Sequence, residues 1–65
     1  MATKKYYTLL SLVEGKWFIQ FGDYSKDVVN EEKEDSYPNC KCKIITTSDS
    51  QEAIQAKVNE LNKGV

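Results

Sequence analysis

The feature that most constrains this chain is a change of pattern at Gly22. Residues 17–21 alternate in the manner of a β-strand, Gly22 and Asp23 interrupt that alternation, and a strongly charged run typical of a helix follows. The chain holds only 65 residues, so a single small core is expected. The remaining elements must therefore pack around this strand and the helix that leaves it.

A first strand is predicted over residues 5–13, which are mostly aromatic, β-branched or leucine and end at Glu14-Gly15, a suitable two-residue hairpin loop. If Val13 pairs with Lys16, then Leu12 faces Trp17, Leu10 faces Ile19 and Thr8 faces Phe21. The expected core face comprises Leu10, Leu12, Trp17, Ile19 and Phe21. The opposite face is expected to stay open, and it carries Tyr7, Leu9, Ser11, Val13, Phe18 and Gln20.

Three further elements complete the predicted fold. A helix is expected over residues 25–36, a third strand over 40–47 after the breaker Tyr37-Pro38-Asn39, and a second helix over 49–62 with an apolar stripe of Ile54, Val58 and Leu61. The prediction is one α+β domain over residues 1–65, with order β-β-α-β-α and flexible ends at 1–4 and 64–65. A right-handed crossover gives a three-stranded sheet in the order 2-1-3, with both helices on one face.

Composition excludes several kinds of site. The chain has no His, no Arg and two cysteines, Cys40 and Cys42, which are too close for a good disulfide and too few for a four-ligand zinc site. We expect reduced structural thiols, no metal and no cofactor; a metal shared by these cysteines across a dimer is the less favoured alternative. The reduced thiols favour the cytoplasm, and no segment has the length and apolarity of a membrane span.

No set of residues amounts to a catalytic site. Gln20, Asp23 and Tyr24 lie close in sequence, but they have no His, Arg or activated nucleophile beside them, and no glycine-rich loop is present to hold a phosphate. Asp23 is better explained as a helix cap and Tyr24 as the residue that leads into the helix. The sequence therefore predicts neither an enzyme nor a small-molecule substrate.

The sequence favours a surface for a protein partner or for a second copy of the chain. An open sheet face is apolar enough to need cover, and the first helix is acidic; the expected partner-binding residues are Tyr7, Leu9, Val13, Phe18, Gln20, Glu31, Glu32 and Asp35. Imitation of DNA phosphates by that helix is a minor alternative, because lysines interrupt the acidic run.

The main alternative is an accessory nucleic-acid binder, in which four lysines near one edge hold phosphates while Tyr6 or Tyr7 stacks on bases. Those lysines are Lys4, Lys5, Lys41 and Lys43. Nucleic acid is less expected than protein, because the net charge is −1 and arginine, the usual reader of guanine and phosphate, does not occur.

One string resembles a known group of proteins. The run WFIQFGDYSKDVVNEEKED, followed after a gap by KIITTSDSQEAIQAKVNELN, is similar to small, largely uncharacterised phage and prophage proteins with the pattern W-x-x-Q-F-G-D-Y. The likeness covers about two thirds of the chain. It implies a phage origin and a host bacterial cytoplasm, and it implies no reaction. The Cys-Lys-Cys segment does not belong to the shared pattern.

Overall fold

The computed structural model describes residues 4–63, so the predicted flexible ends lie outside the described residues except for Lys4. Its elements are β1 (Lys5–Val13), β2 (Lys16–Asp23), α1 (Lys26–Ser36), β3 (Cys42–Ser48) and α2 (Gln51–Lys63). The predicted α+β class and element order are thus confirmed, with helix and strand ends within about two residues. Neither helix of the described part is long and apolar enough to cross a membrane.

The sheet is antiparallel with strand order β2-β1-β3, as predicted. β1 and β2 join through a two-residue turn in which Glu14 and Gly15 both have positive φ, 52° and 83°. This geometry matches the twist of the two strands and explains the glycine. The pairs of Leu12 with Trp17 and of Leu10 with Ile19 are also confirmed.

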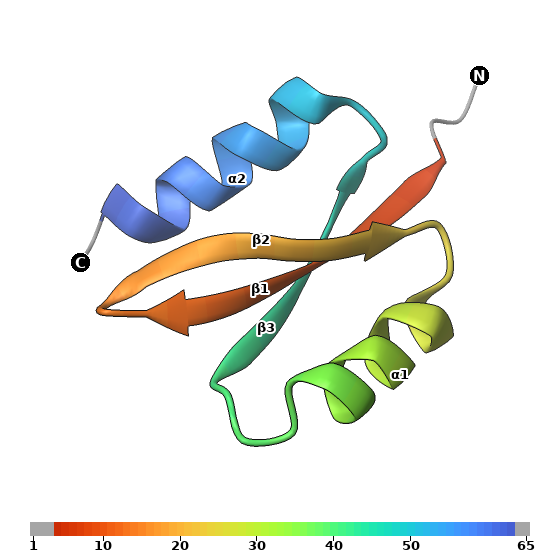
Figure 1. Cartoon of the computed structure of the whole chain (residues 1–65). Helices are drawn as coiled ribbons and strands as arrows, with labels where there is room; N and C mark the ends of the chain where they lie inside the picture. Colours follow the sequence, from red (N-terminus) through yellow and green to blue (C-terminus); the bar gives the residue numbers. More distant parts are fainter. Residues whose placement is uncertain (1–3, 64–65) are drawn as a thin grey trace.

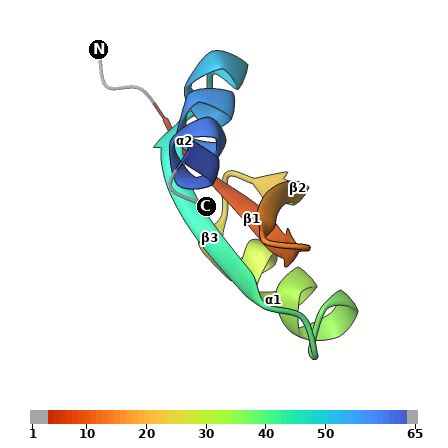
Figure 2. The ribbon, with the colours of Figure 1, turned by 90° about the vertical axis from the view of Figure 1, so that its left-hand side faces the viewer.

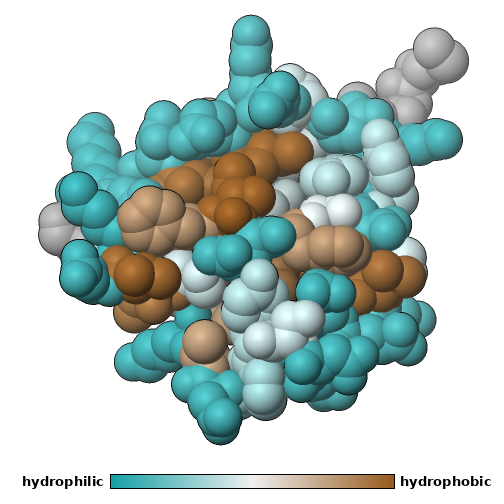
Figure 3. Space-filling view, in the orientation of Figure 1, coloured by the Kyte–Doolittle hydropathy of each residue, from teal (hydrophilic) through white to brown (hydrophobic). Residues whose placement is uncertain are grey.

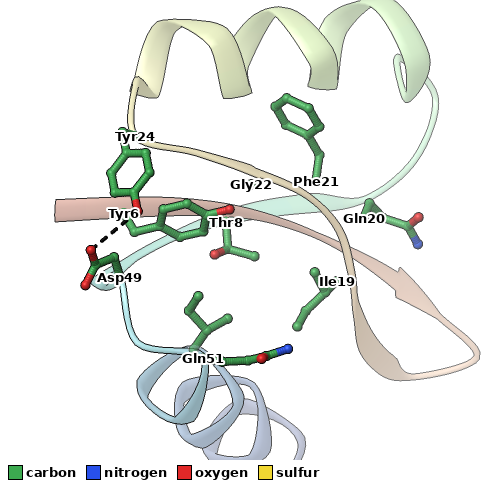
Figure 4. Close-up of a pocket in the computed structure, with 10 residues that line it drawn as sticks. Tyr6, Thr8, Ile19, Gln20, Phe21, Gly22, Tyr24, Asp49 and Gln51 are labelled. Carbon is green, nitrogen blue, oxygen red and sulfur yellow. Dashed lines mark hydrogen bonds between the residues drawn. The ribbon is translucent and has the colours of Figure 1, made fainter. Parts of the chain in front are cut away.

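A β-bulge at Gln20 shifts the register in the second half of β2. Leu10 pairs with Ile19, but the next β1 residue, Leu9, pairs with Phe21, so Gln20 is the extra residue. Thr8 therefore pairs with Gly22 and not with Phe21, contrary to the alternation argument. Since one extra residue reverses the side on which later side chains point, Phe21 lies on the opposite face from Ile19, toward α1 (Figure 4).

The two helices lie on opposite faces of the sheet, with α2 above it and α1 below it in Figure 1 and again in the turned view of Figure 2. The prediction that both cover one face is therefore wrong. A three-stranded sheet is only about 10–14 Å wide, whereas each helix with its side chains is about 10 Å across. Two helices side by side would overhang such a sheet, and one helix on each face covers it better.

Each helix buries a different set of side chains. On the α2 side, Leu10, Ile45 and Val58 form a buried cluster, against which the half-buried Trp17 and Leu61 pack. On the α1 side, Leu9 and Val29 are both fully buried. Burying a side chain of this size contributes about 1.5–3 kcal/mol. Both faces therefore contribute to stability, and neither is an open face.

The outer edge of β2 is partly closed by Asn62 of α2. The backbone N–H of Trp17 donates to Asn62 Oδ1 at 2.7 Å, and Asn62 Nδ2 donates to the carbonyl of Trp17 at 3.1 Å. A neighbouring strand would satisfy the same two groups. One side chain thus replaces a strand partner and ties the end of α2 to the edge of the sheet.

Replacing Asn62 with Ala is expected to lower the free energy of unfolding by about 1–3 kcal/mol, because two hydrogen bonds are lost and Trp17 keeps two unpaired backbone groups. Asn62→Asp should cost at least as much, because a carboxylate oxygen would face the Trp17 carbonyl, which now accepts from Asn62 Nδ2, and a negative charge would lie in the last turn of α2. Asn59→Ala is the matched control on the same helix, because within residues 4–63 the Asn59 side chain bonds only to that of the exposed Gln55. Urea unfolding followed by Trp17 fluorescence measures all three; equal values for Asn62→Ala and Asn59→Ala would contradict the role of Asn62.

Candidate functional site

The residues predicted to bind a partner do not form one exposed face. Leu9 is fully buried under α1, so a partner cannot reach it in the folded chain, and Tyr7 is half-buried. Val13 and Phe18 are each 48% exposed at the hairpin end of the same face. The structure therefore reduces the predicted apolar surface to this pair.

The polar members of the predicted set lie around α1. Gln20 is exposed, yet both ends of its amide are engaged: Nε2 donates to Ser11 Oγ at 2.7 Å, and Oε1 accepts from the Tyr37 hydroxyl at 3.2 Å. Glu31 and Asp35 are exposed, whereas Glu32 is half-buried and accepts a bond from Ser36 Oγ at 2.7 Å. Gln20 therefore helps to hold the segment that follows α1, and its partner-binding role stays a prediction.

A groove on the α2 side is a stronger candidate site. It has a volume of about 470 Å³ and lies between the second half of β2 and the first turns of α2, where Figure 3 shows apolar surface between the two elements. We call it the β2 groove. Its lining residues are Tyr6, Thr8, Ile19, Gln20, Phe21, Gly22, Tyr24, Asp49, Gln51 and Ile54. Gln20 and Phe21 line it at the bulged edge of β2, although the side chain of Phe21 points toward α1 (Figure 4). Ile19 is 48% exposed, so the groove presents a large apolar side chain to solvent.

One end of the β2 groove is aromatic and acidic (Figure 4). The rings of Tyr6 and Tyr24 meet edge to face, with centroids 5.0 Å apart and planes at 80°. The Tyr24 hydroxyl donates a long hydrogen bond of 3.4 Å to Asp49 Oδ2. Desolvation, followed by the charge of Asp49, raises the pKa of Tyr24 above its ordinary value. The phenol is therefore uncharged at neutral pH and leaves Asp49 as the anion of this end.

The floor of the β2 groove contains a buried hydroxyl without a partner. Thr8 is only 1% exposed, and within residues 4–63 its Oγ1 is the buried side-chain polar atom that makes no hydrogen bond. Burying such a group unpaired costs about 1–3 kcal/mol. Because Thr8 lines the groove and points to its α2 side (Figure 4), a polar atom seated there would remove that cost.

The wall of the β2 groove is the backbone of an edge strand. Backbone groups of alternate residues in an antiparallel strand point to the same side. Those of Trp17 point away from β1, toward Asn62, so those of Ile19, and of Gly22 beyond the bulge, point outward as well. Asn62 is engaged at Trp17, and within residues 4–63 no side chain or loop is hydrogen-bonded to the outward groups of Ile19 and Gly22.

The ring of Tyr6 leaves no room for a side chain at position 22. A Cβ at this position would lie 2.8 Å from Tyr6 Cε2 and 2.9 Å from Tyr6 Cζ, closer than real side chains come. The ring of Tyr6 therefore fills the space that a side chain at position 22 would take.

The structure separates the lysines of the nucleic-acid alternative. Lys5 pairs with Ser48, and Lys43 pairs with Leu10, so the two lysines lie about 17 Å apart along the sheet. They also point to opposite faces, because Lys5 and Leu10 occupy alternate positions of β1. Lys5 and Lys43 therefore do not contribute to one phosphate-binding surface.

The cysteines show no arrangement suited to chemistry. Both are free thiols, with Cys40 exposed and Cys42 half-buried. Burial, together with the nearby Cys40, raises the pKa of the Cys42 thiol, against a smaller opposing effect of Lys33. The Cys42 thiol is therefore mostly protonated at neutral pH. Within residues 4–63, no cluster of three or more His, Cys, Asp or Glu residues is placed to hold a metal ion.

Sequence reasoning missed the β2 groove for two reasons. The alternation of residues 17–21 predicts that Ile19 is in the core, which its half-exposed side chain contradicts. Tyr6 and Asp49 lie 43 positions apart in the sequence. The break at Gly22-Asp23 predicts the end of the strand, and Gly22 does line the groove, but nothing in this break indicates a binding site. Comparison with protein-family models, curated proteins and solved structures finds no match to this chain.

Proposed function

We propose that this protein is a non-catalytic interaction module, which binds an extended segment of a partner protein along the β2 groove. The observation that carries the proposal is the outward backbone of Ile19 and Gly22 beside an apolar groove. A segment added to such an edge gains affinity from main-chain hydrogen bonds and specificity from the side chains that alternate into the neighbouring groove.

The lining of the β2 groove supports binding more than catalysis. Its polar groups are hydroxyls, amides and the Asp49 carboxylate. The Thr8 hydroxyl, the one candidate nucleophile on the floor, makes no hydrogen bond to a base in the described structure. An activated nucleophile needs such a base within hydrogen-bond reach. We therefore assign this groove to recognition.

The proposed partner of the β2 groove is a different protein. The resemblance to phage proteins favours a protein of the host bacterial cytoplasm. A second copy of this chain is the competing occupant, since two β2 edges brought together would give a homodimer. Sedimentation velocity distinguishes the two: we expect a monomer at high concentration, and a dimer lost on Ile19→Glu would favour the second copy.

The test of the site compares two neighbouring side chains that point to opposite faces and are equally exposed. Ile19 faces the β2 groove and Phe18 the hairpin surface, each 48% exposed. A displayed library of random heptapeptides is selected against the intact chain, and the enriched peptides are titrated into both variants. Ile19→Glu should weaken binding at least about tenfold, because a charge would enter an apolar contact, and Phe18→Glu should change it less than about twofold.

Backbone amide shifts provide the second readout. The enriched peptides should perturb the amides of residues 19–22 and of Thr8 most strongly. Perturbation centred on Val13 and Phe18, together with loss of binding in Phe18→Glu, would move the site to the hairpin surface. Failure to enrich any peptide above background would remove the proposed function.

A further inference from the structure

The acidic end of the β2 groove indicates what the bound segment carries. Tyr6 comes from β1, Tyr24 follows β2, and Asp49 follows β3, so three separate segments converge there (Figure 4). Among the residues that line the groove, Asp49 bears the only formal charge at neutral pH. This end of the groove therefore attracts a positively charged group of a partner.

The carboxylate has capacity for a ligand. Asp49 is exposed, and its carboxylate lies 3.4 Å from the Tyr24 hydroxyl oxygen. This distance is longer than the roughly 2.5–3.0 Å between the oxygens of a usual O–H···O hydrogen bond. A carboxylate accepts several hydrogen bonds at once. This bond leaves most of that capacity to an incoming ammonium or guanidinium group.

The aromatic rings favour the same kind of group. Cations are attracted to the face of a tyrosine ring, and the chain's own Lys4 places Nζ 5.8 Å from the Tyr24 centroid. In the folded chain this ring therefore already has one cation over it. A partner's cation would share the ring with Lys4, so the carboxylate of Asp49 supplies the larger part of the attraction.

The strand geometry fixes the spacing of the recognised side chains. Side chains of an added strand alternate between the two faces of the sheet. One that points to the α2 side at the level of Ile19 meets Ile19 and Ile54, and the next on that side lies near Gly22, beside Tyr24 and Asp49. The bulge makes Ile19 and Gly22 equivalent to positions two apart on the neighbouring strand, as Leu10 and Thr8 are.

We infer that the β2 groove selects an extended segment with an apolar residue and a basic residue, lysine or arginine, two positions apart. The apolar side chain packs on Ile19 and Ile54, and the basic one lies between Tyr24 and Asp49. Thr8 on the floor gives a hydrogen bond to a polar atom of the segment. This inference rests on the proposed function and adds the chemistry of the partner to it.

The experiment uses synthetic heptapeptides of threonine in two series with a variable fifth position, one with isoleucine at the third position and one with isoleucine at the seventh, which serves a segment antiparallel to β2. Each is titrated into the isotopically labelled intact chain and followed by amide shifts. The peptide with lysine at the fifth position should bind about tenfold more tightly than the one with glutamate. Moving lysine to the sixth position should remove that advantage, and raising the salt concentration should reduce it.

Variants of the chain assign the effect to Asp49. Asp49→Asn should bring the lysine and glutamate peptides within about twofold of each other. Asp27→Asn makes the same charge change on α1, across the sheet, and should leave the tenfold preference intact. Equal affinities in the unaltered chain, with shifts still centred on residues 19–22, would overturn the selectivity and keep the proposed function. No binding by any peptide would overturn both.

Discussion

Truncation of Leu9 to Ala is expected to lower the free energy of unfolding by about 2–5 kcal/mol, the cost of a cavity at a fully buried leucine. The side chain has no exposed surface, because α1 covers the face of the sheet on which it lies. A domain of this size has only about 3–5 kcal/mol to lose. Much of the Leu9→Ala protein should therefore be unfolded at room temperature.

Urea unfolding measured by circular dichroism tests this expectation, with two companion variants. Leu9→Val removes less volume and should cost about 1 kcal/mol, so it remains measurable if Leu9→Ala does not fold. Phe18→Ala, on the same face but 48% exposed, should cost less than Leu9→Ala despite removing more atoms. The reverse order would mean that α1 does not cover this face.

Replacing Gly22 with Val is expected to destabilise the fold by about 1–3 kcal/mol and to displace the ring of Tyr6. The new Cβ would lie 2.8 Å from Tyr6 Cε2, so the ring must move away from the groove floor. Gly22 does not have positive φ, so the cost arises from this contact and not from backbone strain. Loss of the edge-to-face contact with Tyr24 should appear as a shift of both ring resonances.

A double-mutant cycle separates this contact from other effects. In a Tyr6→Ala background the obstructing ring is absent, and Gly22→Val should cost at least about 1 kcal/mol less than in the parent chain. Gly15→Val is the contrasting case. Nothing lies within 4 Å of a Cβ there, yet φ is +83°, so Tyr6→Ala should not relieve its cost. An additive cycle at Gly22 would show that Tyr6 is not the reason for the glycine.

The sequence predicts the elements and the strand order because each depends on local signals. The Glu14-Gly15 turn sets the hairpin register, which holds from Val13 and Lys16 to Leu10 and Ile19. The alternation of residues 17–21 contains no sign of the bulge at Gln20. An unbulged strand places Ile19 and Phe21 on one face, and the real one places them on opposite faces.

Two wrong predictions, the side of the sheet that α1 covers and the exposure of Leu9, follow from missing the bulge at Gln20. An unbulged strand puts Phe21 on the α2 side and makes that side the more apolar one, so both helices are predicted there and Leu9 is left on the open face that a partner would cover. In the structure, Phe21 joins the face that α1 covers (Figure 4), and Leu9 is buried there. The β2 groove escapes prediction because it brings together Tyr6, Tyr24 and Asp49, which have no common pattern in the sequence.

The side chain of Asn62 sets an upper limit on how long a complex at β2 lasts. Because it already holds both backbone groups of Trp17, an added segment begins at Ile19 and pairs with only about four residues, roughly 13 Å of strand. A contact this short is far smaller than a standard protein interface. We expect micromolar or weaker dissociation constants and residence times of about a second or less, a contact suited to repeated sampling of partners.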